Sequence, residues 1–261
     1  MANNVSKKKE TSVSNINSAM LLQDAGAGQE KMSQEDMMIP RLSILQQMSD
    51  QVNKANGGYV PGAEPGMILD NVANRAINGE KGIEVVPISY RRAHIEWKKD
   101  RGGLVADHGS DEKVLEKCSR GDKGEYFTDE GNEIVITGEY FVFLIDDDGY
   151  TPAVLSMSKS QFKKARTWNT MMNRLMIDAD GQVINPAMFW TSYQLTTVPE
   201  KNDQGSWFGW SFKMNHDAKS GGIIQNHSQG EEIYLAARNF KAQVAQGDVK
   251  VSPESQDDDV M

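Results

Sequence analysis

Hydrophobic and polar positions are most regularly patterned between Glu139 and Met176. Residues 140–145 are all aromatic or apolar, residues 146–149 are three aspartates and a glycine, and residues 152–155 are apolar again. An Asp-Gly pair between two β-rich runs is a hairpin signal, because both residues tolerate the backbone angles of a tight turn. The pattern therefore predicts two antiparallel strands joined at residues 146–149.

The next segment, Ser158 to Leu175, has the pattern of an amphipathic helix. Ser158 and Gln161 have the spacing of a capping box, in which each side chain bonds a backbone donor of the first turn. Apolar residues recur at helical spacing and form one face: Phe162, Ala165, Met172, Leu175 and Met176. Basic residues lie towards another face, which we expect to be turned to water: Lys159, Lys163, Arg166 and Arg174.

A long strand is predicted from Gly82 to Trp97, where the pattern has a period of two. The first half is apolar on both faces, as in a central strand. Strict alternation places eight residues on one face: Ile83, Val85, Pro87, Ser89, Arg91, Ala93, Ile95 and Trp97. The second half of the strand and the residues just after it combine basic and aromatic side chains, at Arg91, Arg92, Trp97, Lys98 and Lys99.

The remaining elements have shorter signals. Strands are predicted within residues 37–45 and 67–72, an antiparallel pair at 187–198 and 206–214, and a helix at 231–246 that Gly247 ends. Loops are predicted at residues 100–132, which can hold a small insertion, and at 199–205.

These elements predict a mainly β protein with a few helices. An antiparallel Greek-key barrel of the oligonucleotide-binding type (OB-fold), with insertions, fits their order, and a β-sandwich is the main competitor. The chain divides into a flexible N-terminal arm at 1–34, an OB-fold-like domain at 35–247 and a disordered acidic tail at 248–261, because both ends are polar and poor in aromatics.

Composition and charge limit the cellular compartment and the kind of binding surface that we expect. Cys118 is the one cysteine among 261 residues, so neither an internal disulfide nor a cysteine-based zinc site can form, and a reducing cytoplasm fits. No apolar run approaches a membrane span, and the N-terminus lacks an apolar signal core. The net charge of −9 argues against a surface that binds nucleic acid everywhere, although a local basic groove is compatible with it.

Motifs of common enzymes are absent. The sequence has no nucleophile elbow, Walker A loop, glycine-rich dinucleotide loop or HExxH, and its four histidines are scattered. Asp146, Asp147 and Asp148 lack the ligand spacing of a calcium loop, which favours the hairpin turn. The same three carboxylates could serve a two-metal nuclease, and this alternative stays open. We otherwise predict no catalytic residues and no cofactor.

A binding surface is the chemistry that remains. Single-stranded nucleic acid needs cations for its phosphates and flat rings for its bases. The candidate residues are Arg91, Arg92, Trp97, Lys98, Lys99, Lys163, Lys164, Arg166, Trp168, Trp207, Trp210 and Phe212. An aromatic side chain, taken singly, is more often a core residue, and a single Lys or Arg side chain is more often only solvated. The hypothesis therefore rests on the set of candidates and not on any one of them.

The acidic tail adds a second binding element. It carries five acids against one lysine, and Asp257, Asp258 and Asp259 stand near its end. A flexible anionic segment can occupy a basic groove as a phosphate mimic or dock on a basic pocket of a partner.

At this point the chain resembles the single-stranded DNA-binding proteins of tailed bacteriophages. The resemblance rests on the Ile39-Pro40-Arg41-Leu42 entry, residues 152–155 feeding the helix at 158–175, the Tyr193–Trp210 hairpin and the acidic end. It implies an OB-fold that coats single strands during DNA replication and recombination, with a tail that recruits phage replication proteins in the host cytoplasm. The tail ends Val260-Met261 instead of on an aromatic residue, which leaves its partner open.

The leading hypothesis is therefore a non-catalytic, sequence-tolerant single-stranded DNA-binding protein. A phage structural or decoration protein, whose β-domain packs against copies of itself, is the first alternative, and a metal-dependent nuclease is the second. Self-association is compatible with the first two functions.

Overall fold

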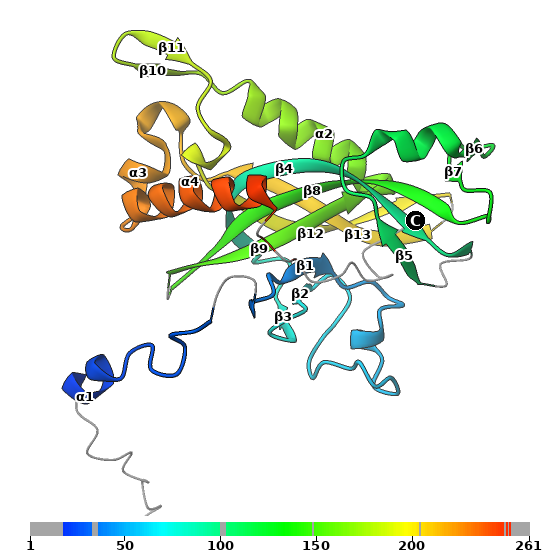
Figure 1. The fold of residues 1–261 in the computed structure, drawn as a ribbon, viewed down its shortest axis with the longest axis horizontal. Helices are drawn as coiled ribbons and strands as arrows, with labels where there is room; N and C mark the ends of the chain where they lie inside the picture. The colour runs from blue at the N-terminus through cyan, green and yellow to red at the C-terminus, as the bar shows by residue number, and fades with distance from the viewer. Residues whose placement is uncertain are drawn as a thin grey trace, which may run out of the picture.

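A strongly curled sheet organises the computed structural model, which describes residues 18–32, 36–99, 103–147, 149–203, 205–247, 249 and 251. Its strand order is β13-β12-β4-β8-β9-β1-β2-β3 (Figure 1). These strands are β1 (Arg41–Ile44), β2 (Ile68–Asp70), β3 (Arg75–Ile77), β4 (Ile83–Trp97), β8 (Glu133–Asp146), β9 (Gly149–Ser158), β12 (Tyr193–Asn202) and β13 (Gly205–Met214). Neighbours are antiparallel except β1 and β9, which run parallel.

Two helices cover opposite faces of this sheet. Helix α2 (Lys159–Asn173) packs on the inner, concave face, where Tyr140, Tyr193 and Trp210 belong to the largest apolar cluster. Helix α4 (Gly230–Gln246), with the short α3 (Gly222–Asn226), packs on the outer face around Phe141 and Phe240. Burial raises the pKa of the Tyr140 hydroxyl, which donates to the Ala165 carbonyl and so ties β8 to α2.

The predicted hairpin and both long helices are confirmed. β8 and β9 pair down to Asp146 and Gly149, where the predicted turn lies. Helix α4 ends at Gly247, whose φ of 81° favours glycine. The capping box is wrong, because Ser158 makes no side-chain cap bond. Gln161 instead faces β13, where its carbonyl oxygen accepts from the Trp210 N–H at 2.9 Å.

A β-bulge in β4 corrects the predicted faces of the long strand. The pairing with β8 passes from Pro87–Val142 to Ser89–Phe141, so one residue of β4 is inserted. Val85, before the bulge, belongs to the inner cluster, whereas Arg91, after it, lies over the Phe141 ring of the outer cluster. Because one extra residue turns every later side chain to the opposite face, strict alternation could not hold over the whole strand.

The sheet is neither closed nor purely antiparallel, which corrects the predicted antiparallel barrel. The N-terminal strand β1 pairs with β9 on one side and β2 on the other, so β9 does not pair with the free edge of β13, and side chains bond that edge instead. Gln46 accepts from the Phe208 N–H at 2.9 Å and donates to the Phe208 carbonyl at 3.0 Å, and Lys164 donates to the Trp210 carbonyl at 2.6 Å. Backbone groups of the β13 edge are thereby satisfied without a further strand.

Smaller elements decorate this frame. Between β4 and β8 lie β5 (Leu104–Asp107), a 3-10 helix (Glu112–Lys117), β6 (Ser119–Arg120) and β7 (Tyr126–Phe127), where the sequence predicted a loop or insertion. After α2 come the hairpin β10 (Ile177–Ala179) and β11 (Gln182–Ile184) and a 3-10 turn (Met188–Trp190); further 3-10 turns are Asp50–Val52 and Ala218–Ser220. The loop predicted at 199–205 is mostly strand, since β12 continues to Asn202.

The two predicted ends are described only in part. Residues 1–17, 33–35 and 252–261 lie outside the described residues, together with Asp257, Asp258 and Asp259. Helix α1 (Ser18–Gln23) lies apart from the sheet in Figure 1. Val249 and Val251 pack against the outer cluster, and Val251 forms a parallel bridge with Ile39. None of the helices in the described part of the chain has the length and apolar character needed to cross a membrane.

Candidate nucleic-acid interface

Three of the four candidate tryptophans are core residues. Trp97, Trp168 and Trp210 have exposed fractions of 3%, 0% and 2%. Trp168 lies on the buried face of α2, with its ring 4.6 Å from that of Tyr140 and 5.5 Å from that of Phe212. No face of these rings is open to a base, so the expectation that they stack on DNA is corrected. Trp168 continues the helical spacing of Ala165 and Met172 and lies with Trp210 in the inner cluster, whereas Trp97 packs in a small separate cluster at the end of β4.

Trp207 is the candidate tryptophan that keeps a partly exposed ring. It lies near the tip of the β12–β13 hairpin, where its indole Nε1 donates to Glu200 Oε2 at 3.0 Å. Phe212, further along β13, is partly buried and stacks on Trp168 at an interplanar angle of 19°. Among these aromatics, Trp207 is the one that can offer a ring without unpacking the core.

The basic residues of α2 divide into two groups. Lys163 and Arg166 are exposed, and Arg166 lies over the Phe162 ring at 4.9 Å, with no carboxylate partner for either among the described residues. Lys164 instead pairs with Glu200 and bonds the β13 edge. Lys164 is thus used by the fold, and Lys163 and Arg166 are the candidates on α2 that stay exposed.

The basic residues in and just after β4 also differ in exposure and pairing. Lys98 and Lys99 follow the strand and are exposed, whereas Arg92 is exposed but pairs with Glu112 at 3.4 Å. Arg91 is half-buried on the outer face. The structure thus separates these four residues: Arg91 and Arg92 pair with different carboxylates, and Lys98 and Lys99 follow the end of β4.

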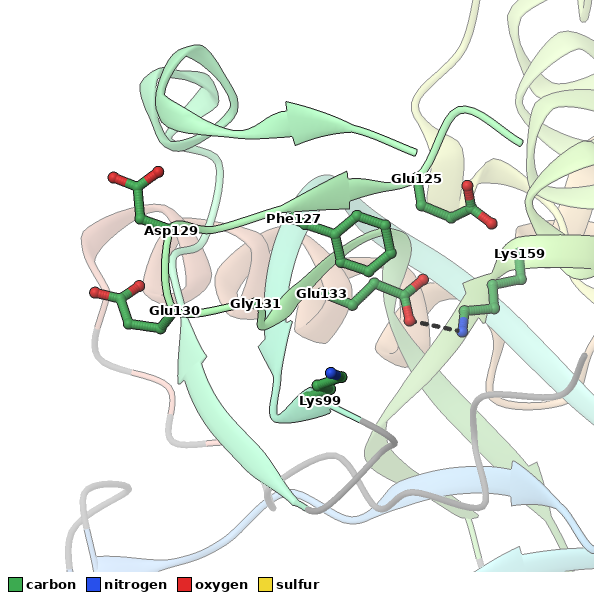
Figure 2. Close-up of a pocket in the computed structure, with 8 residues that line it drawn as sticks. All are labelled: Lys99, Glu125, Phe127, Asp129, Glu130, Gly131, Glu133 and Lys159. Carbon is green, nitrogen blue, oxygen red and sulfur yellow. Dashed lines mark hydrogen bonds and ion pairs between the residues drawn. The ribbon is translucent and has the colours of Figure 1, made fainter. Parts of the chain in front are cut away.

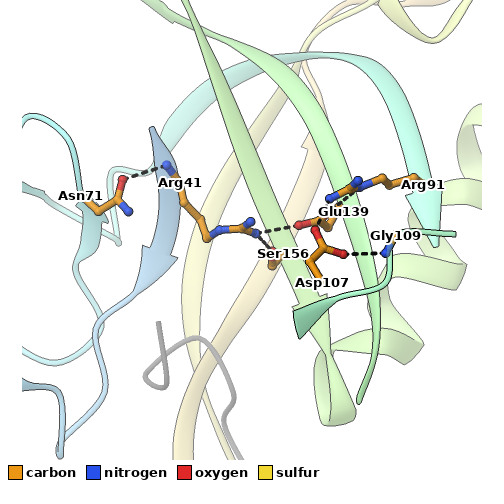
Figure 3. A network of polar contacts seen from close by, with 7 residues as sticks. All are labelled: Arg41, Asn71, Arg91, Asp107, Gly109, Glu139 and Ser156. Atoms are coloured by element: carbon orange, nitrogen blue, oxygen red, sulfur yellow. Dashed lines mark hydrogen bonds and ion pairs between the residues drawn. The ribbon is translucent and has the colours of Figure 1, made fainter. Parts of the chain in front are cut away.

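Arg91 belongs to a polar network that joins five strands (Figure 3). Its Nε donates to Glu139 on β8, whose other oxygen accepts from Arg41 Nη1 on β1 at 2.9 Å. Arg41 also bonds Ser156 of β9, and Arg91 Nη2 donates to Asp107 Oδ2 of β5 at 2.8 Å. Two arginines, distant in the sequence, therefore meet on the outer face of β8 and β9.

Burial decides the electrostatics of this network. Glu139 is fully buried and Arg41 nearly so. Desolvation alone would lower the pKa of Arg91, but the adjacent Glu139 and Asp107 carboxylates raise it on balance. Removing one partner of such a buried pair typically costs about 3–5 kcal/mol, because the other charge is left uncompensated. The Arg41–Glu139 half is therefore structural, and the Arg91 end reaches solvent.

A polar hollow near the end of β4 has the wrong charge for phosphate. A cavity of about 670 Å³ lies beside β7 and the start of β8, lined by Lys99, Glu125, Phe127, Asp129, Glu130, Gly131, Glu133 and Lys159 (Figure 2). Lys159 pairs with Glu133 at 3.4 Å. Four carboxylates against two lysines make this hollow acidic, so Lys99 faces local negative charge.

The nuclease hypothesis finds no metal site in the described part of the chain. Asp146 and Asp147 are exposed at the β8–β9 turn, and Asp148 lies outside the described residues. Among those residues, no group of three or more His, Cys, Asp or Glu side chains is placed to hold a metal ion.

Sequence reasoning missed Arg41, Glu139 and Asp107. A signal for Glu139 was present, because a carboxylate inside an otherwise apolar central strand needs a buried cationic partner. Which cation supplies it was not readable, since Arg41 lies 98 residues away.

These features define an α+β protein with a curled, open mixed sheet and a two-arginine site on its outer face. A family model described as Pam3 phage gp34-like protein matches residues 8–250, so the chain belongs to the Pam3 phage gp34-like family. The family description confirms the phage part of the resemblance. No curated protein and no solved structure matches the chain.

Proposed function

We propose that this phage protein binds single-stranded DNA without sequence preference, on the part of the outer face where the Arg91 end of the arginine network reaches solvent. The observation that carries the proposal is the half-exposed Arg91, which the buried Glu139 holds in place while Arg41 pairs with the other oxygen of Glu139. Phosphates need fixed cations along a groove, and a guanidinium held by a buried carboxylate is fixed at low entropic cost.

The order of the strands supports an open sheet with the strand order of the OB type, not a closed barrel. β4, β8 and β9 follow one another as antiparallel neighbours, and β12 returns beside β4. This is the 4-1-2-3 order of a Greek key, and OB-folds bind oligonucleotides on their second and third strands and on the loops that follow strands one and four. We assign those strands to β8 and β9, and those loops to residues 98–132 and the β12–β13 turn. On this assignment β1 interrupts the closure of the barrel.

Trp207, Lys163 and Arg166 form a second part of the proposed interface, separate from Arg91, because α2 packs on the inner face of the sheet. Trp207 stands at the β12–β13 turn, the second loop of the assignment, where its partly exposed ring can stack a base. Lys163 and Arg166 can take phosphates of the same strand as it leaves the hairpin, since Glu200 links Trp207 to α2. Coating of single strands in phage replication and recombination, with partner recruitment by the acidic tail, is the role we propose.

The proposal is tested by titrating fluorescein-labelled oligo-dT with the full chain at low salt. Arg91→Gln should weaken binding more than Arg238→Gln, a matched change of an exposed arginine on α4, outside the proposed face. Log K should also fall linearly with log salt, by roughly 0.7 for each phosphate contact on a single strand. Thermal melting checks that both variants fold.

Absence of binding at micromolar protein and low salt would overturn the proposal. Equal affinity of folded Arg91→Gln and Arg238→Gln variants would place any interface elsewhere. Concentration-dependent self-assembly without DNA binding would instead favour the structural or decoration role.

A further inference from the structure

Asp107 occupies an anion site at the solvent-facing end of the arginine network. Its Oδ2 accepts from Arg91 Nη2 at 2.8 Å, and its Oδ1 accepts from the Gly109 N–H at 2.7 Å. The Arg91 and Asp107 side chains are 32% and 38% exposed, whereas that of Glu139 is fully buried. The carboxylate thus lies between a guanidinium and a backbone donor, at the edge of the proposed face (Figure 3).

The donors around Asp107 are those that bind phosphate in proteins. A guanidinium offers parallel N–H groups to an oxyanion, and backbone N–H groups in a turn add neutral donors. Gly109 supplies that turn with a φ of 56°, and a Cβ there would lie 3.9 Å from Arg91 Nη1, so the chain passes close to the guanidinium. The two carboxylate oxygens of Asp107 therefore accept from donors that suit two oxygens of a phosphate.

Charge balance and burial distinguish Asp107 from Glu139, the other carboxylate of the network. Arg41 and Arg91 supply two positive charges, and Glu139 and Asp107 supply two negative ones. Glu139 is fully buried and cannot leave without exposing Arg41 to an uncompensated environment. Asp107 stands at the end of the four-residue strand β5 and reaches solvent, so one incoming anion can replace it and preserve the balance.

We propose that Asp107 is a built-in substitute for a phosphate, displaced from Arg91 and Gly109 when a DNA phosphodiester binds. Glu139 keeps Arg91 in place during the exchange. This inference rests on the proposed function for the identity of the ligand, but the anion site itself can be probed separately.

The first test compares Asp107→Asn with Glu112→Gln by oligo-dT titration at low salt. Asparagine keeps an oxygen for the Gly109 N–H and removes the competing charge. Glu112→Gln is the matched control, because Glu112 lies in the same segment and pairs with Arg92. We expect Asp107→Asn to tighten binding roughly three- to tenfold more than Glu112→Gln, the scale of one charge-assisted hydrogen bond. Adding Arg91→Gln should remove the gain.

The second test uses inorganic pyrophosphate and thermal melting, without DNA. Pyrophosphate should raise the melting temperature of Asp107→Asn more than that of the parent chain, and this difference should vanish in the Arg91→Gln/Asp107→Asn double variant. Oligo-dT binding that Asp107→Asn improves no more than Glu112→Gln would refute the exchange and leave the proposed function standing. If no chain binds oligo-dT, the proposed function fails, and the pyrophosphate result alone decides whether the anion site exists; equal shifts in all three chains would then refute it.

Discussion

At the scale of single residues, identical side chains have opposite roles in this protein. Trp168 is enclosed by Tyr140, Tyr193 and Phe212, whereas Trp207 is partly exposed and its indole donates a hydrogen bond to Glu200. Base stacking needs a free ring face, and core packing needs none. Stability and DNA affinity should therefore respond to different tryptophans.

Replacing Trp168 with Ala should lower the free energy of unfolding by about 3–5 kcal/mol, because it removes a large, fully buried ring. Trp207→Ala should change stability by less than about 1 kcal/mol but weaken oligo-dT binding by about 1–3 kcal/mol if one base stacks there. Urea unfolding and fluorescence titration measure the two effects. A folded Trp207→Ala variant with the parent's affinity would show that no base stacks on this ring.

At the scale of elements, α2 is both a structural brace and a basic surface. Gln161 and Lys164 bond the free edge of β13, whereas Lys163 and Arg166 face solvent. Neighbouring cations on one helix thus differ in what they stabilise, because one side of α2 meets the sheet edge and the other does not.

Changing Lys163 and Arg166 together to Gln should flatten the dependence of log K on log salt by roughly 0.7 for each lost phosphate contact. Their change should leave the unfolding free energy nearly unaltered. Lys164→Met should do the reverse, costing about 1–3 kcal/mol of stability because the Trp210 carbonyl loses its donor. Oligo-dT titrations at several salt concentrations, with urea unfolding of each variant, separate the two roles. An unchanged salt slope in the double variant would make Lys163 and Arg166 merely solvated.

At the scale of the whole molecule, the C-terminal segment enters the sheet region beside the arginine network. Val251 pairs in parallel with Ile39, two residues before Arg41. Asp257, Asp258 and Asp259 follow Val251 by six to eight residues in the sequence, and a fully extended chain of that length spans roughly 20–28 Å. The competition between the acidic tail and DNA is therefore a prediction that the chain length permits.

Changing Asp257, Asp258 and Asp259 together to Asn should tighten oligo-dT binding at low salt. A tethered anion acts at about millimolar effective concentration, and its attraction to the groove is screened by salt, so the gain should shrink as salt rises. Truncation after Val251 should also tighten oligo-dT binding at low salt, and it should abolish recruitment of replication partners. Cutting after Gly247 is a poorer test, because Val249 and Val251 pack against the outer cluster. Equal affinity of the triple variant and the parent at low salt would refute the competition.

The elements that could be predicted from the sequence are those set by residues close to one another in the chain. The turn after Asp146, the extents of α2 and α4 and the long strand β4 all follow from signals within a few residues. Their apolar period and turn residues act on neighbours in the chain, so no tertiary information was needed. The basic character of α2 and of the end of β4 was likewise readable from the sequence.

Tertiary structure alone decided which of these residues can meet a ligand. One bulge in β4 moved Arg91 to the outer face, and the packing of α2 put Trp168 in the core. The parallel place of β1 beside β9 brought Arg41 to Glu139 across 98 residues. A periodic pattern specifies alternation but neither register nor partner, and both are set by the free energy of burying distant segments together.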